Sequence, residues 1–340
     1  MNKIWQFAVV LAALGWLLPA GANAQTFDVV GTRAAGMGGA FVGVADDASA
    51  VYWNPAGLAM GSYVSLLMDG GVRDAVPDVG SRGMQRSSFL IAATMPALGV
   101  SYYQLRHAFA VPDTLLPPAG AAVLAGPTHI RVDSLVTHHA GVTFVQSILP
   151  QVALGSTLKL VHGVASTQFS DLGDVEGALE RDDPDGRGTT KFDMDFGLMA
   201  TTGRLQFGLT VRNVTEPEFT STDGRALELE RQARAGVSYA VLAGLKVAVD
   251  FDLLEVDDAF GDRRDAAFGF EARVARKGWV RSGYRFNTAD ANGPSDFRDR
   301  RAFTFGGTFA ATASVMVDGL VISGGDQSGR GWGISTRFVY

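Results

Sequence analysis

The sequence predicts an all-β protein: a transmembrane antiparallel β-barrel of about fourteen strands, with a small N-terminal plug inside it. Three observations lead to this fold. The chain opens with an export signal, short segments of alternating polarity follow one another to the C-terminus, and the last of them ends on an aromatic residue.

The N-terminus has the parts of a secretory signal peptide, which we place at residues 1–24. Lys3 supplies positive charge, residues 4–18 form an apolar run broken only by Gln6, and Ala22-Asn23-Ala24 is a small-residue cleavage site. The apolar run is shorter than the roughly 20 residues that a transmembrane helix needs. The chain has no cysteine, so it forms no disulfides and offers no lipid attachment through a thiol. We therefore expect an exported protein with a cleaved signal peptide.

The composition limits how the mature protein meets a membrane. The net charge of −6 becomes −7 when Lys3 leaves with the signal peptide, so no positive field exists to bind nucleic acid. After the signal peptide, no uncharged apolar run is long enough to cross a membrane as a helix. Backbone groups in lipid must pair internally, so a closed barrel is the remaining way to span.

Alternating polarity is clearest at residues 246–253. Val247, Val249, Phe251 and Leu253 share one face, and Lys246, Ala248, Asp250 and Asp252 share the other. A period of two is typical of a strand. A soluble sandwich with one wet face would show the same period. Charges such as Asp250 and Glu271 in the middle of strands favour a wet or plugged lumen, because a packed core would not accept them.

The barrel is expected to occupy residues 62–340. The predicted strands are 62–70, 86–95, 97–107, 129–147, 151–167, 190–201, 204–213, 227–241, 244–254, 265–276, 278–287, 301–310, 312–322 and 331–340. Tight joins alternate with long ones, and the long joins are 71–85, 108–128, 168–189, 214–226, 255–264, 288–300 and 323–330. Short turns on one side and long loops on the other are typical of outer-membrane barrels.

The C-terminal strand carries a second, independent signal. Trp332, Ile334, Phe338 and Tyr340 fall on one face and end the chain on an aromatic residue. This pattern resembles the terminal signal that the barrel assembly machinery of the outer membrane reads, although an ordinary edge strand could also end this way. We therefore expect the bacterial outer membrane as the location, with its lipid and its barrel assembly machinery as partners.

Residues 25–61, which precede the barrel, are rich in small residues. Such residues let backbone segments pack closely where space is short, as inside a barrel. Asp46 and Ser49 are candidates to cap a short helix that begins near Ala48 and stops at Pro55. A dinucleotide-binding loop is not indicated, because the third glycine is missing: Phe41 stands there.

A family resemblance rests on two motifs in this segment. Arg33-x-x-Gly-Met-Gly-Gly-Ala-Phe41 is followed by Ala45-Asp-Asp-Ala-Ser-Ala-Val-Tyr-Trp-Asn-Pro-Ala-Gly57. Together they resemble the N-terminal plug, or hatch, of the FadL/TodX outer-membrane transport superfamily, which includes PorV/PorQ-like and TraF-like barrels. The resemblance implies a fourteen-stranded barrel around a plug with the motif residues Arg33, Gly36, Gly38, Gly39, Asp46, Asp47, Asn54, Pro55 and Gly57.

The branch of the superfamily stays open. Residues 212–239 are more similar to the PorV-like and TraF-like branches, whereas the plug motif does not distinguish between branches. FadL itself is considerably longer and holds its first ligand site in large extracellular loops. This chain is compact, which puts a surface groove of that kind in doubt.

The long join at residues 108–128 is the most apolar, and external loops are usually polar. Its candidate ligand contacts are Phe109, Leu115, Leu116, Val123 and Leu124. Apolar exposure of this kind often marks a binding surface. The alternative is a loop that folds inward over the lumen and packs on the plug.

Catalytic and metal motifs are missing from the sequence. The five histidines stand in no H-E-x-x-H motif and have no G-x-S-x-G partner, and Ser134 with His138 or His139 is a poor candidate set. Residues 181–188 resemble a calcium loop, but Arg181 stands in place of the first acidic ligand. We therefore predict no enzyme activity, no cofactor and no metal site.

Two functions fit these features. The first is passive uptake of hydrophobic small molecules, fatty-acid-like or aromatic, past the plug and out through or beneath the wall. The second is a non-transport barrel of the PorV/PorQ or TraF-like kind that binds protein partners in secretion or transfer. Charged lumen residues such as Arg212, Arg234 and Glu271 are expected to hold the plug under either function.

Overall fold

The computed structural model of the chain describes residues 30–75, 82–112, 129–171, 173–180, 186–258, 261–289, 301–325 and 329–340. The predicted signal peptide and four of the candidate ligand contacts (Leu115, Leu116, Val123 and Leu124) lie outside these ranges. In the described ranges, no helix is both long enough and apolar enough to cross a membrane.

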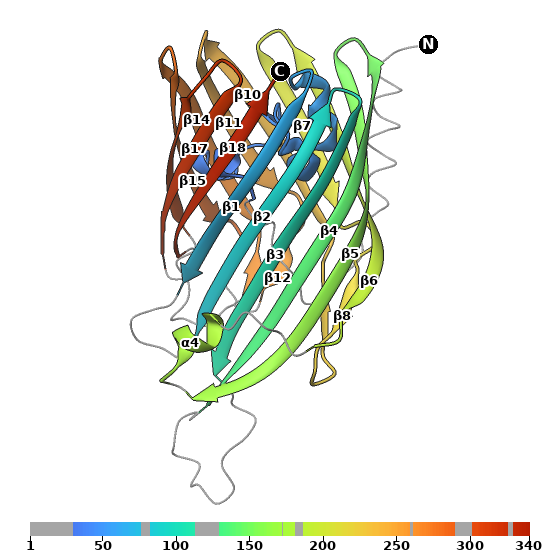
Figure 1. The fold of residues 1–340 in the computed structure, drawn as a ribbon, viewed down its shortest axis with the longest axis vertical. Helices are drawn as coiled ribbons and strands as arrows, with labels where there is room; N and C mark the ends of the chain where they lie inside the picture. Colours follow the sequence, from blue (N-terminus) through green and yellow to red (C-terminus); the bar gives the residue numbers. More distant parts are fainter. Residues whose placement is uncertain are drawn as a thin grey trace, which may run out of the picture.

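Fourteen antiparallel strands of the described chain close into one barrel, which confirms the predicted fold (Figure 1). Neighbours in the wall follow chain order, and β1 pairs with β18 from Ser65↔Val339 to Asp74↔Arg330 to close the ring. The wall strands are β1 (Ser65–Ala75), β2 (Gly83–Met95), β3 (Leu98–Pro112), β4 (His129–Leu149), β5 (Val152–Asp171), β6 (Thr189–Thr202), β7 (Leu205–Arg212), β10 (Gln232–Leu242), β11 (Leu245–Asp252), β14 (Asp265–Ala275), β15 (Gly278–Asn287), β16 (Ala302–Ala310), β17 (Val315–Gly324) and β18 (Arg330–Val339).

The two ends of the barrel differ. We call the end with short connections, such as the one between β14 and β15, the turn end; it lies at the top of Figure 1, together with the C-terminus. The opposite end is the loop end. β4 and β5, with 21 and 20 residues, are the longest strands, so the wall stands taller on their side.

The tall side of the wall is covered on both faces near the loop end. Helix α4 (Val175–Glu180) packs against Ala108, Ala110 and Ile130 on the outward face, and Arg106 donates to the carbonyl of Leu179 at 2.6 Å. On the lumen face, Phe219 of the hairpin β8 (Glu218–Thr220) and β9 (Ala226–Glu228) packs in one apolar cluster with Leu135, Val161 and Ala165. A second hairpin, β12 (Val256–Asp258) with β13 (Gly261–Arg263), follows β11.

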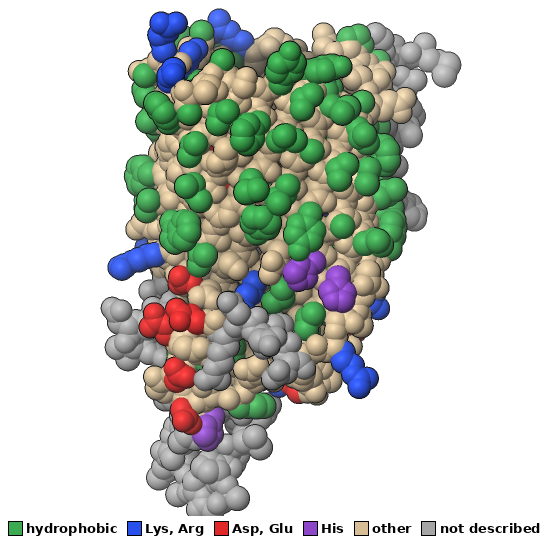
Figure 2. Space-filling view, in the orientation of Figure 1, with side chains coloured by type: hydrophobic (Ala, Val, Ile, Leu, Met, Phe, Trp, Pro, Cys, Tyr) green, Lys and Arg blue, Asp and Glu red, His purple; other side chains and the backbone are tan. Residues whose placement is uncertain are grey.

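The outer surface is apolar between the two ends. Figure 2 shows hydrophobic side chains spread over the wall, giving way to charged and histidine side chains toward the loop end. β11 alternates as predicted: Val247, Val249 and Phe251 are exposed, while Asp250 points inward and is buried. An apolar outside around a charged inside is the reverse of a soluble sandwich core.

Some predicted boundaries were wrong. β3 continues to Pro112, so Phe109 lies in a strand and not in the join predicted at 108–128. β10 begins at Gln232 rather than 227, because residues 226–228 belong to the lumen hairpin. The join predicted at 168–189 contains the end of β5 and helix α4. Alternating polarity marks strands but not where a ladder ends, because these strands continue past the apolar part of the wall.

We expect the energetic cost of a charge on the outer face to depend on its depth. Phe270 lies outward in the middle of β14, and Val274 lies outward next to the turn. Phe270→Arg should lower the free energy of unfolding from lipid vesicles by about 2–4 kcal/mol, whereas Val274→Arg should cost about 0–1 kcal/mol. Reversible denaturant unfolding in vesicles measures both. Equal costs at the two depths would contradict a lipid-facing outer wall.

Candidate functional site

The plug, residues 30–61, lies inside the barrel toward the turn end (Figure 1). It contains α2 (Thr32–Gly36), α3 (Ala50–Trp53) and the 3-10 helix η1 (Pro55–Met60). Trp53 is fully buried, donates from its ring nitrogen to the carbonyl of Val30 at 2.7 Å, and makes an edge contact with Phe41. The plug thus has a small aromatic centre of its own.

Glycines of the wall receive the backbone of the plug. These wall glycines form three directly paired sets in neighbouring strands: Gly155↔Gly197, Gly208↔Gly236 and Gly269↔Gly283. A Cβ at any of them would overlap plug atoms, for example the backbone nitrogens of Ala56 at Gly155 and of Gly38 at Gly283. The plug therefore rests on the wall backbone to backbone, which side chains would prevent.

The glycines of the plug motif also allow the plug backbone to lie close to the wall and to itself. Gly38 and Gly39 have φ of 71° and 86°, which side chains rarely adopt. Gly36 faces Gly306 of β16, with 3.5 Å from an ideal Cβ to the Cα atom of Gly306. A Cβ on Gly57 would overlap the carbonyl of Ala45, within the plug itself.

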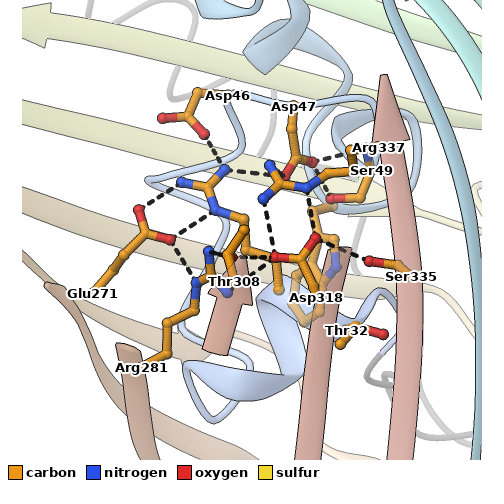
Figure 3. A network of polar contacts seen from close by, with 12 residues as sticks. Thr32, Asp46, Asp47, Ser49, Glu271, Arg281, Thr308, Asp318, Ser335 and Arg337 are labelled. Carbon is orange, nitrogen blue, oxygen red and sulfur yellow. Dashed lines mark hydrogen bonds and ion pairs between the residues drawn. The ribbon is translucent and has the colours of Figure 1, made fainter. Parts of the chain in front are cut away.

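Arg33 is the centre of a charged network between the plug and the turn end of the wall. Figure 3 shows its partners Asp46, Asp47 and Glu271. The Arg33 guanidinium donates twice to Glu271 of β14, each at 2.8 Å, and once to Asp47 at 3.0 Å, and it also pairs with Asp46. Glu271 in turn accepts from Arg281 of β15 at 2.5 Å. Bidentate pairs of this kind fix geometry as well as charge.

The network continues to the closing strands. Asp318 of β17 accepts from Arg281 at 3.1 Å and from Arg337 of β18 at 2.8 Å, and Arg337 also lies 3.4 Å from Asp47. Lys246 of β11 donates to Asp46 at 2.9 Å. Four cations thus face four carboxylates, which is how buried charges are tolerated away from water.

Asp46 of the plug is held ionised by this network. Burial raises its pKa, but the charges of Arg33 and Lys246 outweigh burial and lower the pKa to about 2. The predicted helix cap at Asp46 and Ser49 was wrong. Asp47 accepts from the backbone nitrogen of Ser49 at 2.9 Å, and α3 begins at Ala50 without a side-chain cap.

Asn54 and Pro55 join the plug to β6. The Asn54 amide nitrogen donates to the carbonyls of Val42 and Leu198, both at 3.0 Å, and its oxygen accepts from the nitrogen of Ala56 at 3.2 Å. Pro55 begins η1, where its missing N–H costs nothing. Asparagine can make all three hydrogen bonds, because its amide nitrogen donates two of them and its amide oxygen accepts the third.

A second charged cluster lies on β5, β6 and β7; Arg212 was expected in the lumen from the sequence, but Lys159 was missed. Lys159 is fully buried and lies 2.7 Å from Asp195 and 3.0 Å from Asp193. Arg212 stacks over the ring of Tyr52 in the plug, 3.6 Å from its centroid. A lysine in the middle of the alternating segment 152–165, on its inward face, was the available signal.

Two cavities of the described chain border the plug. The wider one, of about 360 Å³, lies at the turn end and is lined by residues of the charged network such as Arg33, Asp46 and Glu271. The smaller one, of about 40 Å³, separates Thr32 and Ala35 from the wall, where its polar lining includes Asp69, Arg86 and His107. Its apolar lining includes Leu105, Leu320 and Ile322. Such a volume holds a few water molecules at most. A larger solute therefore passes through this smaller cavity only if the plug or the wall moves.

The remaining candidate residues fall in different places. Phe109 is half-buried on the lumen face of β3, with the Arg86 guanidinium 5.5 Å from its ring centroid. Trp332, Ile334 and Phe338 are exposed on the outer face of β18. Tyr340 follows β18, is exposed, and pairs through its backbone with Val64.

Comparisons with solved structures show which known folds this barrel shares. A FadL homologue of Pseudomonas aeruginosa has a TM-score of 0.61 at 12% identity, covering 94% of this chain and 100% of its own. The CymD monoaromatic hydrocarbon channel has a TM-score of 0.60 at 12% identity, covering 93% and 99%. The Pseudomonas putida toluene transporter TodX has a TM-score of 0.58 at 11% identity, covering 90% and 97%. These likenesses establish the FadL/TodX-type fold.

The sequence comparisons are narrower. The family model of the F plasmid transfer operon TraF protein matches residues 106–252, less than half of the chain. Among curated proteins, no sequence is significantly similar to this one. The matched part runs from the tall strands β3–β5 to β11.

The wall glycines generate a prediction about plug docking. Gly283→Val should place methyl groups against Gly38 and lower the free energy of unfolding by about 1–3 kcal/mol, as overpacking does. Gly319→Val is the matched control, because nothing lies within 4 Å of a Cβ there. Thermal unfolding in detergent and protease cleavage within the plug measure the difference. A plug equally protected in both variants would show that close approach is unnecessary.

The lowered pKa of Asp46 sets a pH window. Since its folded pKa of about 2 lies below the ordinary aspartate value of 3.8, its ionised form stabilises the fold above pH 3.8, and this contribution is lost as pH falls toward 2. Asp46→Asn should therefore unfold at a lower temperature than the original chain at neutral pH, and the gap should close near pH 2. A gap that is constant with pH would exclude the ion pair as its cause.

Proposed function

We propose that the chain is a bacterial outer-membrane barrel that lets hydrophobic small molecules, fatty-acid-like or aromatic, enter the cell passively. The turn end would then face the periplasm and the loop end the outside. The apolar outer wall, the alternation of turns and loops, and the FadL/TodX-type fold support this placement. The neighbours with this fold are described as transporters and channels.

The observation that carries the proposal is the small cavity between the plug and a thin part of the wall. There, Gly71 of β1 pairs with Gly333 of β18, so the wall has no side chain at either position. The cavity is lined inside by Leu105, Leu320 and Ile322, and its lining includes Val72 and Trp332 from the outer face. An apolar solute that displaces part of the plug has an apolar surface to follow, and only backbone separates it from lipid.

The buried charge around Arg33 gives the plug a defined resting position. Solute passage would shift the plug locally, while the paired charges at the turn end hold the remainder in place. In this resting position the gap beside Thr32 and Ala35, about 40 Å³, is too small for such a solute. The route is therefore gated by the plug and not open.

A second function has one specific observation in its favour. The TraF family model matches residues 106–252, the region that includes the tall wall with α4 outside and the β8–β9 hairpin inside. A rim covered on both faces is a rigid surface that a protein partner could contact. In this reading the barrel binds proteins of a transfer or secretion assembly and carries no solute.

Blocking the thin part of the wall tests uptake. Gly71→Leu adds a side chain on the lumen side of the thin wall, against the cavity, and should reduce uptake of a toluene-like or fatty-acid probe severalfold in cells that express the barrel. Gly319→Leu, an outward position in open space, should leave uptake unchanged. Radiolabelled uptake into cells from which the original gene has been deleted measures both.

The same experiment can decide against transport. If cells without the gene take up a panel of hydrophobic substrates normally, and secretion or transfer proteins co-purify with the barrel, the second function is favoured. Outer-membrane fractionation and heat-modifiable gel migration of each variant establish that the barrel has folded. A freely soluble periplasmic product would contradict both functions.

A further inference from the structure

Two histidines face each other on the outer surface of the barrel. His138 of β4 and His162 of β5 are direct register partners, and their rings lie 6.3 Å apart between centroids. Residues directly opposite on neighbouring antiparallel strands share a face and have adjacent Cβ atoms. Both side chains are accessible, whereas the next residue, His139, is buried on the lumen face and stacks on Tyr103.

The pair lies where the apolar outer surface ends. Two residues nearer the turn end, the outward positions are Ala140 and Leu160, and Leu160 is 56% exposed. Figure 2 shows two histidine side chains next to each other at the loop-end edge of the hydrophobic field. An imidazole pair at this edge is accessible to ions in the surrounding water, because both side chains are exposed to solvent in part.

Hydroxyl groups orient both rings through the same nitrogen. The Tyr102 hydroxyl lies 2.8 Å from Nδ1 of His138, and the Thr190 hydroxyl lies 3.0 Å from Nδ1 of His162. With Nδ1–H donating to the hydroxyl oxygen, Nε2 carries the lone pair that binds a metal. Histidine ligands in metal sites are held by this kind of outer contact, which fixes the tautomer and the ring.

We propose that His138 and His162 form a two-ligand site for a borderline transition-metal dication, of which Zn²⁺ is the representative. Imidazole nitrogens suit zinc, copper and nickel, whereas calcium and magnesium require oxygen ligands. In the structure Nε2 of His162 lies beside Gly188, so metal binding requires the exposed His162 side chain to turn from β6 toward His138. The Tyr102 hydroxyl continues to orient the His138 ring. Water or an anionic surface group fills the remaining coordination positions, as in sites with open positions.

Zinc titration of the purified full-length barrel in detergent tests the site. We expect one Zn²⁺ per barrel by calorimetry, and at least a tenfold loss of affinity in each of His138→Ala and His162→Ala. His129→Ala is the matched control: it removes another accessible histidine, at the start of β4 beside Asp171, and should bind zinc as the original chain does. Tyr102→Phe should weaken binding without changing the stoichiometry, because it frees the His138 ring.

Copper spectroscopy gives a second measurement. Its result would not change in the variants if His138 and His162 only stabilised the fold. With Cu²⁺ as the probe, the electron paramagnetic resonance spectrum should show coupling to two imidazole nitrogens in the original chain and to one in each single variant. Unchanged zinc affinity in both His138→Ala and His162→Ala would overturn the site, as would loss of binding in His129→Ala. Heat-modifiable gel migration shows that each variant has folded, so the outcome is independent of any transport activity.

Discussion

Contact between the backbone of the plug and the backbone of the wall is the constraint on which the rest of the structure depends. It requires glycine on the wall, paired across strands at Gly155↔Gly197 and Gly269↔Gly283, and small residues in the plug. It also brings Arg33 close enough to reach β14, and Asn54 close enough to reach the carbonyl of Leu198 in β6. Without this approach, neither the charge network nor the narrow gap between α2 and the wall would exist.

The paired charges determine how strongly the plug is held inside the barrel. A carboxylate or guanidinium moved into this interior loses hydration, and only partners with good geometry compensate for that loss. The cluster around Arg33 ties the plug to five strands at the turn end, and the cluster around Lys159 lies beside the aromatic side of the plug at Tyr52. The interior thus combines these paired charges with an apolar cluster that the plug forms with the wall, including Phe41, Trp53 and Leu90.

The sequence was sufficient for the barrel because its signals are local. Alternation within segments such as 246–253 marks the wall, and turn and loop lengths fix the order of strands. The site was less predictable because its contacts are long-range. Arg33 meets Glu271 across 238 residues, so Asp46 was interpreted as a helix cap when its partners are Arg33 and Lys246. The inward glycines gave a weak signal, because a residue without a side chain does not add to the alternation of polar and apolar positions. Lys159 gave a weak signal because the sequence does not show that its side chain is buried.

Closure of the ring by β1 and β18 has a consequence for the order of assembly. The two strands come from opposite ends of the barrel sequence, so their pairing forms only after all the wall strands between them are available. A plug that contains Trp53, Tyr52 and Phe41 is too bulky to thread through a finished, side-chain-filled ring. It therefore has to be enclosed as the sheet curls around it, which would make the plug a template for the curvature of the wall and not a late occupant.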